Sequence, residues 1–217
     1  MYAIIAKDIG QAARFIQEGR IVAIPTGTAY ALACDALQGH ALQRLRTLKQ
    51  RPQEKTFTVF MEDELMFRYF VISKDEQTLW EKYQGQPLTL LLKPKPDLEH
   101  LAQDDKVGLR IIDHPLMQQL ADVVNVPLTA TSANISGAPP AYTPEKILEY
   151  FPGTVAPARR SLGGGGPDPT QGTTYNLSLA AILDGGTLAH NPPTTIGKLE
   201  NGKIEIIRPG KLQPELG

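Results

Sequence analysis

Apolar residues recur at helical spacing in several parts of the chain. In residues 8–20 they share one face, Asp8 can act as the N-cap, and Gly19 can end the helix. Residues 41–50 carry an apolar stripe of alanine and leucine, with the basic side chains off it. The same spacing, with a capping box or an early proline, predicts three more helices, at 73–83, 113–124 and 143–151.

Short apolar runs between these helices predict β-strands. They lie at residues 21–26, 56–61, 88–93, 107–112, 127–132 and 179–186. Residues 195–207 read as a hairpin, because Asn201 and Gly202 suit the positive φ values of a type I′ turn. Strands and helices alternate through the middle of the chain and antiparallel strands close it. This order predicts one α/β domain, with a twisted mixed β-sheet flanked by helices.

Composition narrows the class of protein. The 217 residues are 41% hydrophobic and 21% charged, with a net charge of −1, as in ordinary soluble proteins. The single cysteine, Cys34, excludes an internal disulfide. The first residues lack a basic start followed by a long apolar run, and no apolar stretch approaches membrane-spanning length. We therefore expect a cytoplasmic protein without membrane contact. The near-zero net charge argues against a protein that coats nucleic acids without sequence preference.

Metal and phosphate motifs are absent from the sequence. The four histidines show no metal-ligand spacing, so we expect no dedicated metal site. Neither GxxxxGK[ST] nor GxGxxG occurs, and the glycines at 163–166 precede Pro-Asp-Pro. Residues 155–176 are rich in proline and glycine and lack periodicity. We interpret them as a mobile loop over a site, or as a linker.

Candidate chemistry gathers in three polar stretches. Residues 129–142, TATSANISGAPPAY, combine hydroxyls and one amide without any charge, which fits either a plain turn or a cradle for an anionic ligand. Residues 25–30, PTGTAY, also follow a buried strand. Between them, residues 49–55 place three cations past a helix end, where they fit either a solvated terminus or a phosphate site. Ends of strands at one sheet edge are where α/β proteins bind ligands.

Read together, these stretches resemble a known family. PTxTxY, LKxRP, GLRxxDHP, TSANxSG and a final RPG occur in the order and spacing of the YrdC family, the threonylcarbamoyl-AMP synthases. The match runs over nearly the whole chain. It implies a single YrdC-like domain at residues 4–210 with a concave ligand cleft, followed by a tail at 211–217.

The resemblance also implies a reaction. L-Threonine, bicarbonate and ATP would give threonylcarbamoyl-AMP and pyrophosphate, with Mg²⁺ accompanying the ATP. A threonylcarbamoyl transferase complex would then modify position 37 of tRNA, and any contact of this chain with tRNA itself would be weak. Cations and N–H groups can stabilise the charge that builds on the leaving pyrophosphate, so the reaction requires no protein nucleophile.

The residues of the site follow by position in the motifs. A catalytic tetrad would comprise Lys49, Arg51, Ser132 and Asn134. ATP would contact Arg51, Lys55, Lys106, Asn134, Tyr142 and Arg208. Threonine would contact Thr28, Phe60, Arg110, Ser132 and Thr194.

Two departures from the family pattern leave alternatives open. Gly27 stands where the family usually has an acid, and Phe60 stands where many members have a histidine. Both changes remove polar groups from the expected threonine pocket. The stretches PTGTAYAL and KTFTVF also resemble the YciO branch, which suggests an RNA- or nucleotide-binding protein without synthase activity. A carbamoyl transfer to another substrate, as in a related hydrogenase-maturation domain, is a further interpretation.

Overall fold

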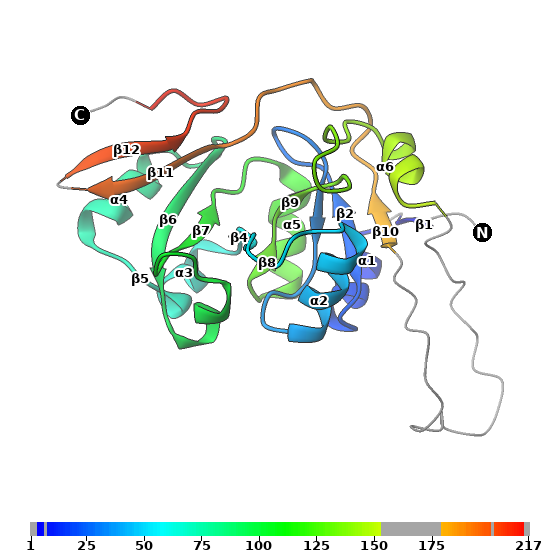
Figure 1. The fold of residues 1–217 in the computed structure, drawn as a ribbon, viewed down its shortest axis with the longest axis horizontal. Coiled ribbons are helices and arrows are strands. Elements are labelled where there is room, and N and C mark those ends of the chain that lie inside the picture. The colour runs from blue at the N-terminus through cyan, green and yellow to red at the C-terminus, as the bar shows by residue number, and fades with distance from the viewer. Residues whose placement is uncertain (1–3, 7, 153–178, 201, 215–217) are drawn as a thin grey trace.

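The computed structural model describes residues 4–6, 8–152, 179–200 and 202–214. Its strands form two mixed sheets that lie side by side in Figure 1. The first is five-stranded, in the order β1-β10-β2-β3-β9. Its strands are β1 (Ile4–Ala6), β10 (Leu179–Leu183), β2 (Ile21–Ile24), β3 (Ala31–Ala33) and β9 (Thr131–Ser132). The first three are parallel, and β3 and β9 join them in antiparallel pairs.

The second sheet follows the order β12-β11-β6-β7-β4-β8, and β5 pairs with β6 outside this order. Its strands are β12 (Lys203–Arg208), β11 (Thr195–Glu200), β6 (Leu88–Pro94), β7 (Val107–Arg110), β4 (Val59–Phe60), β8 (Leu128–Thr129) and β5 (Phe70–Val71). The β11–β6 and β4–β7 pairs are parallel, and the other pairs are antiparallel. The architecture is the α/β class that the sequence predicts, with the strands divided between two sheets.

Helices cover both sheets. They are α1 (Ile9–Gln17), α2 (Gly39–Leu48), α3 (Asp63–Tyr69), α4 (Lys74–Lys82), α5 (Pro115–Val124) and α6 (Pro144–Tyr150), with the 3₁₀ helix η1 at Pro96–Leu101. Helix α1 packs against α5 and β10, and its Ala12 and Ile16 belong to the same buried cluster as Met117 and Leu120 of α5. No described helix has the length and apolar character needed to cross a membrane.

The helix predictions with clear end signals are confirmed. Asp8 Oδ1 accepts the amide hydrogen of Gln11 at 2.7 Å and so caps α1. Ser73 and Glu76 form the capping box of α4. The β11–β12 hairpin is also confirmed, with Gly202 at a φ of +75°. The loop predicted at residues 155–176 lies outside the described residues.

The predicted strand at 127–132 is two strands, one in each sheet. Strand β8 pairs with β4 in the second sheet, and β9 pairs with β3 in the first. Ala130 is the link, and its N–H donates to Thr58 O at 2.9 Å while its own carbonyl accepts from Thr58 Oγ1. The chain therefore crosses from sheet to sheet at the place where the polar stretches gather.

Candidate functional site

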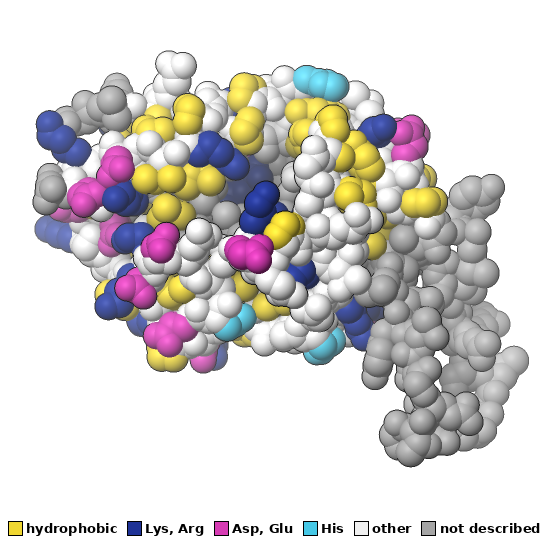
Figure 2. Space-filling view, viewed as in Figure 1, with side chains coloured by type: hydrophobic (Ala, Val, Ile, Leu, Met, Phe, Trp, Pro, Cys, Tyr) yellow, Lys and Arg dark blue, Asp and Glu magenta, His cyan; other side chains and the backbone are white. Residues whose placement is uncertain are grey.

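A cavity of about 870 Å³ lies between the two sheets. Figure 2 shows it as a hollow with Lys and Arg side chains inside it and around its rim. Most of the residues that the motifs single out line it, from both sheets and from the loops between them. They are Thr28, Arg51, Lys55, Lys106, Arg110, Ser132, Asn134, Tyr142, Thr194 and Arg208. Lys49 and Phe60 are not part of this lining.

The end of helix α2 directs Lys49 and Arg51 to different sides. The helix ends at Leu48, and Gln50 takes a left-handed φ of 50°. The N–H groups of Gln50 and Arg51 then donate back to Thr47 O and Arg46 O, as in a helix C-cap that reverses the chain. Lys49 points inward as a result, whereas Arg51, two residues later, reaches the cavity.

Lys49 is buried, with only 1% of its surface exposed. Its Nζ donates to Asn134 O at 2.8 Å, to Asn134 Oδ1 at 3.1 Å and to Ser132 O. Burial and the charge of Arg51 lower the pKa of Lys49 to about 7. The interpretation of Lys49 as part of a solvated helix terminus is therefore wrong, because the 132–136 loop covers the helix end. Alanine at this position would disturb the fold as well as the site.

Arg51 stiffens the loop that carries Lys55. Its Nε donates to Lys55 O at 3.2 Å and its Nη2 donates to Thr56 O, while the guanidinium lies 4.9 Å from the ring centroid of Phe57. Burial and the charge of Arg46 lower the pKa of Arg51, but an arginine keeps its charge near neutral pH. Two adjacent cations thus face the cavity on a loop held by its own backbone.

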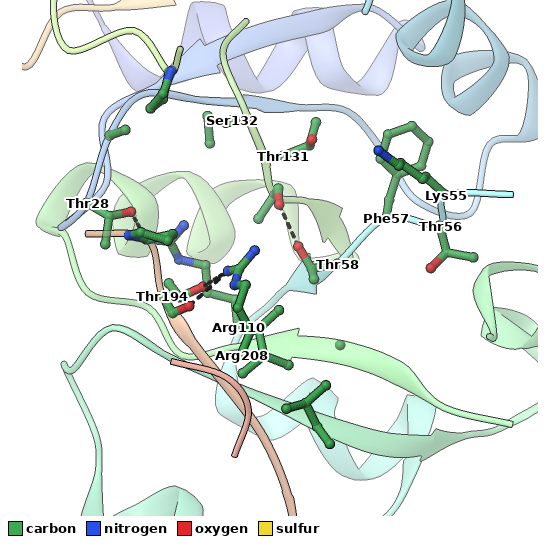
Figure 3. A pocket seen from close by; sticks show the side chains of 18 of the residues that line it. Thr28, Lys55, Thr56, Phe57, Thr58, Arg110, Thr131, Ser132, Thr194 and Arg208 are labelled. Carbon is green, nitrogen blue, oxygen red and sulfur yellow. Dashed lines mark hydrogen bonds between the residues drawn. The ribbon is translucent and has the colours of Figure 1, made fainter. Parts of the chain in front are cut away.

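Arg110 lies at the other end of the cavity. Figure 3 shows it grouped with Thr28, Thr194 and Arg208, away from Lys55, Thr56 and Phe57. Its Nη2 contacts Asp113 Oδ2 at 2.9 Å and Thr28 Oγ1 at 3.2 Å, and the two charged side chains are only 9% and 2% exposed. Its buried Nε has no hydrogen-bond partner among the described residues. Arg110 also lines the cavity, and a guanidinium there suits a carboxylate ligand.

Arg208 is fixed by Thr194. Its Nη2 donates to Thr194 O at 2.8 Å and to Thr194 Oγ1 at 3.3 Å, and Thr89 also hydrogen-bonds to Thr194. Burial and the charge of Arg110 lower the pKa of Arg208. Two guanidinium groups therefore influence each other here, which favours binding of an anion that neutralises them.

Lys106 and Tyr142 complete the positions expected to contact ATP. Lys106 follows a tight turn in which Asp104 and Asp105 have φ values of 50° and 59°, and it starts the approach to β7. Tyr142 stacks on His190 with ring centroids 3.9 Å apart. His190 was not among the residues singled out from the sequence, because nothing local marks it as a neighbour of Tyr142.

Phe60 belongs to the core. Its side chain is fully buried, with 0% exposed, and it packs in the cluster beneath the first sheet. The expectation that Phe60 contacts threonine is corrected accordingly, because strand β4 turns this side chain away from the cavity. The neighbouring Thr58 lines the cavity instead.

Asp113 occupies the space beside Gly27. The Gly27 N–H donates to Asp113 Oδ1 at 3.1 Å, and a Cβ at position 27 would lie 2.7 Å from Asp113 Oδ2. The sequence motif contained Asp113, yet its role was missed, although the spacing of three residues from Arg110 was a usable signal. Position 27 lacks the acid that the family usually has there, and the carboxylate of Asp113 lies beside it instead.

We expect Gly27→Ala to lower the free energy of unfolding by about 1–3 kcal/mol, because the added methyl must push Asp113 away from Arg110. Urea denaturation measures the change. Gly39→Ala is the matched control, since a Cβ there meets nothing within 4 Å and alanine favours the helix. Equal stability of the two variants would contradict the Gly27–Asp113 contact.

The described residues offer little other reactive chemistry. They contain no group of three or more His, Cys, Asp or Glu side chains that could hold a metal ion. Burial raises the pKa of the Cys34 thiol to about 12, so Cys34 is not a thiolate near neutral pH. The cavity therefore brings together cations, hydroxyls and amides, a set suited to holding anionic substrates.

The sequence and the fold match known proteins. A model of the Sua5/YciO/YrdC family, described as "Telomere recombination", matches residues 14–158. The chain belongs to this family. It is 30% identical over 208 residues to a threonylcarbamoyl-AMP synthase from Vibrio campbellii, which covers 91% of this chain and 97% of that protein.

Two solved structures share the fold. P. abyssi Sua5 complexed with L-threonine has a TM-score of 0.75 and 26% identity, over 93% of this chain and 54% of the Sua5 chain. This chain thus spans about half of that Sua5 protein. E. coli YciO has a TM-score of 0.72 at 22% identity, over 93% of this chain and 88% of that one. The YciO likeness concerns the fold alone.

Proposed function

We propose that this chain is an L-threonylcarbamoyl-AMP synthase, which converts L-threonine, bicarbonate and ATP to threonylcarbamoyl-AMP and pyrophosphate for tRNA modification. The observation that carries the proposal is the cavity, which gathers Arg51, Lys55, Arg110 and Arg208 with the Ser132–Asn134 loop. The 30% identity to a named synthase over most of both chains supports it.

Different cations of the cavity bind the two substrates, ATP and threonine. Arg51 and Lys55 lie on one loop and bind the phosphates, where the fork of Arg51 pairs with two oxygens. Arg110 lines the cavity and binds the threonine carboxylate, while Asp113 holds its guanidinium in place. The threonine of the P. abyssi Sua5 complex supports an amino-acid site in this fold.

The reaction then needs positioning and charge stabilisation. A carbamate oxygen attacks the α-phosphorus, the bond to pyrophosphate breaks, and negative charge builds on the leaving group. Arg51 and Lys55 are fixed in advance on a loop held by backbone contacts, so they stabilise that charge without reorganising. Mg²⁺ would enter with ATP and neutralise part of its charge. That fits a cavity without a cluster of acidic ligands among the described residues, because Mg²⁺ bound to phosphates keeps several waters.

The direct test is product formation. Purified protein is incubated with ATP, Mg²⁺, bicarbonate and labelled L-threonine, and pyrophosphate and threonylcarbamoyl-AMP are measured. Both products should appear only with all four components. Omission of bicarbonate and replacement of threonine by serine or valine are the controls. Pyrophosphate without threonylcarbamoyl-AMP, or neither product, would overturn the proposal.

We expect weak RNA binding that ATP diminishes. Arg44 donates to Gly19 O at 3.0 Å and Arg46 donates to Lys55 O at 3.0 Å, so their guanidinium groups are committed to the protein. Arg51 and Lys55 face the cavity that would hold ATP, and Lys49 is buried outside it. Filter binding of tRNA over a range of salt, with and without ATP, measures the effect. Tight binding at physiological salt that ignores ATP would favour the RNA-binding interpretation instead.

The product is a mixed anhydride, which would be consumed by a transferase complex acting on tRNA. A second enzyme is required because the proposed step does not transfer the threonylcarbamoyl group to tRNA. The protein would work in the cytoplasm, where ATP and tRNA are available.

A further inference from the structure

Lys49 is buried and contacts two residues of the site without lining the cavity itself. Its Nζ donates to Asn134 O, to Asn134 Oδ1 and to Ser132 O, and its own carbonyl accepts the Ser136 N–H at 2.8 Å. It does not line the cavity, whereas Ser132 and Asn134 do. Any effect of Lys49 on a ligand must therefore pass through the loop that it holds.

These contacts fix the direction of the next hydrogen bonds. The amide nitrogen of Asn134, Nδ2, donates to Ala138 O, a carbonyl that can only accept. The amide atom that faces Lys49 Nζ is therefore Oδ1, at 3.1 Å. Oδ1 can only accept, and Ser132 Oγ lies 2.6 Å from it. Ser132 must therefore donate its single hydroxyl hydrogen to Asn134.

Ser132 consequently presents only lone pairs to the cavity. Its side chain is exposed there, and Figure 3 shows it across the cavity from Arg110. An oxygen in this state receives an N–H or O–H group and offers nothing to a carboxylate or phosphate oxygen. The anionic groups of the substrates have Arg51 and Arg110 for that purpose.

We propose that Lys49 is a positioning residue which, through Asn134, fixes Ser132 as a hydrogen-bond acceptor for the amine of the amino-acid substrate. This inference rests on the proposed function. Strand pairing sets Ser132 opposite Ala31, and Ala133 N–H donates to Tyr30 O, so Ser132 adjoins the segment that carries Thr28. Thr28 in turn contacts Arg110, which would hold the carboxylate of the same substrate.

The chemistry favours the amine as the donor. Carbamate formation requires the nitrogen lone pair to point at the incoming carbon, so the N–H bonds must be held in other directions. An acceptor that cannot rotate its own hydrogen into the cavity holds one of them. A serine free to donate would bind a carboxylate oxygen equally well and would leave the amine unoriented.

The test compares two ligands that differ by the amine. Wild type and Ser132→Ala are titrated calorimetrically with L-threonine and with 3-hydroxybutanoate, which lacks the amino group, in the presence of Mg²⁺ and a non-hydrolysable ATP analogue. Ser132→Ala should weaken threonine binding about tenfold and leave 3-hydroxybutanoate nearly unchanged. Equal weakening of both ligands, or of neither, overturns the inference.

Lys49→Met should produce the same selective loss, and adding Ser132→Ala to it should cost little more, because the residues act in series. If Lys49→Met does not fold, Asn134→Ala interrupts the same chain of contacts. Ser136→Ala is the matched control, since its hydroxyl has no partner among the described residues and does not line the cavity. It should change neither affinity, and additive losses in the double variant overturn the role of Lys49.

The outcomes separate this inference from the proposed function. Wild-type protein that binds neither ligand would overturn the synthase proposal itself. Wild-type protein that binds threonine, with a Ser132→Ala variant that loses both ligands alike, would overturn only the acceptor role of Ser132.

Discussion

Replacing Arg51 with alanine is expected to lower kcat/KM for adenylate formation about 10³-fold, because a fixed guanidinium beside the phosphates stabilises the charge of the transition state. The loop should persist, since Arg46 also donates to Lys55 O and lies 5.2 Å from the Phe57 ring. Steady-state pyrophosphate release measures the loss. Arg51→Lys should recover only part of the rate, because an ammonium cannot pair with two oxygens at once.

Arg46→Ala is the matched control for Arg51→Ala. Arg46 shares the loop and the aromatic contact with Arg51, yet it does not line the cavity. Its loss should change kcat/KM less than about fivefold, in line with the 0.2–1 kcal/mol of an exposed charged contact. If Arg51→Ala keeps near-native turnover, or if both variants lose kcat/KM equally, Arg51 does not act on the phosphates.

Arg110→Ala is expected to reduce both stability and threonine binding. It leaves the Asp113 carboxylate buried without its cation, which should lower the free energy of unfolding by about 3–5 kcal/mol. It also removes a guanidinium that lines the cavity, so threonine-dependent turnover should fall below detection. Urea denaturation and threonine titration measure the two effects separately.

The double variant Arg110→Ala, Asp113→Ala separates the structural from the binding role of Arg110. Removing both charges relieves the unpaired carboxylate, so stability should recover by a large part of the initial loss. Threonine binding should remain absent. A double variant that regains threonine binding along with stability would show that Arg110 serves only to hold Asp113.

The sequence predicted those elements whose signals are local. Helices α1 and α4 carry side-chain caps that follow from residues three positions apart. The chain between residues 61 and 73 holds helix α3, which was missed because seven residues are too few to show a helical period. Strand β3, Ala31–Ala33, was missed because alanine-rich residues carry no strand preference.

The site was predicted where motif order sufficed and missed where distant chain segments meet. Most of the residues carried over from the motifs line one cavity. The burial of Lys49 depends on the 132–136 loop, more than eighty residues away, so no local pattern could show it. The Asp113 carboxylate beside Gly27 is hidden for the same reason, because the two residues meet only in the folded chain.

The crossing at Ala130 makes the cavity a property of the whole domain. Strands β8 and β9 are only two residues each. Strand β8 pairs with β4 of the second sheet and also donates from Thr129 N–H to Cys34 O beside β3, whereas β9 pairs with β3 of the first sheet. If either sheet opens, the segment that carries Ser132 loses one of its two anchors, and the walls of the cavity separate. Heating should therefore abolish ligand binding and secondary structure at one temperature, and no partly melted form should keep half of the site.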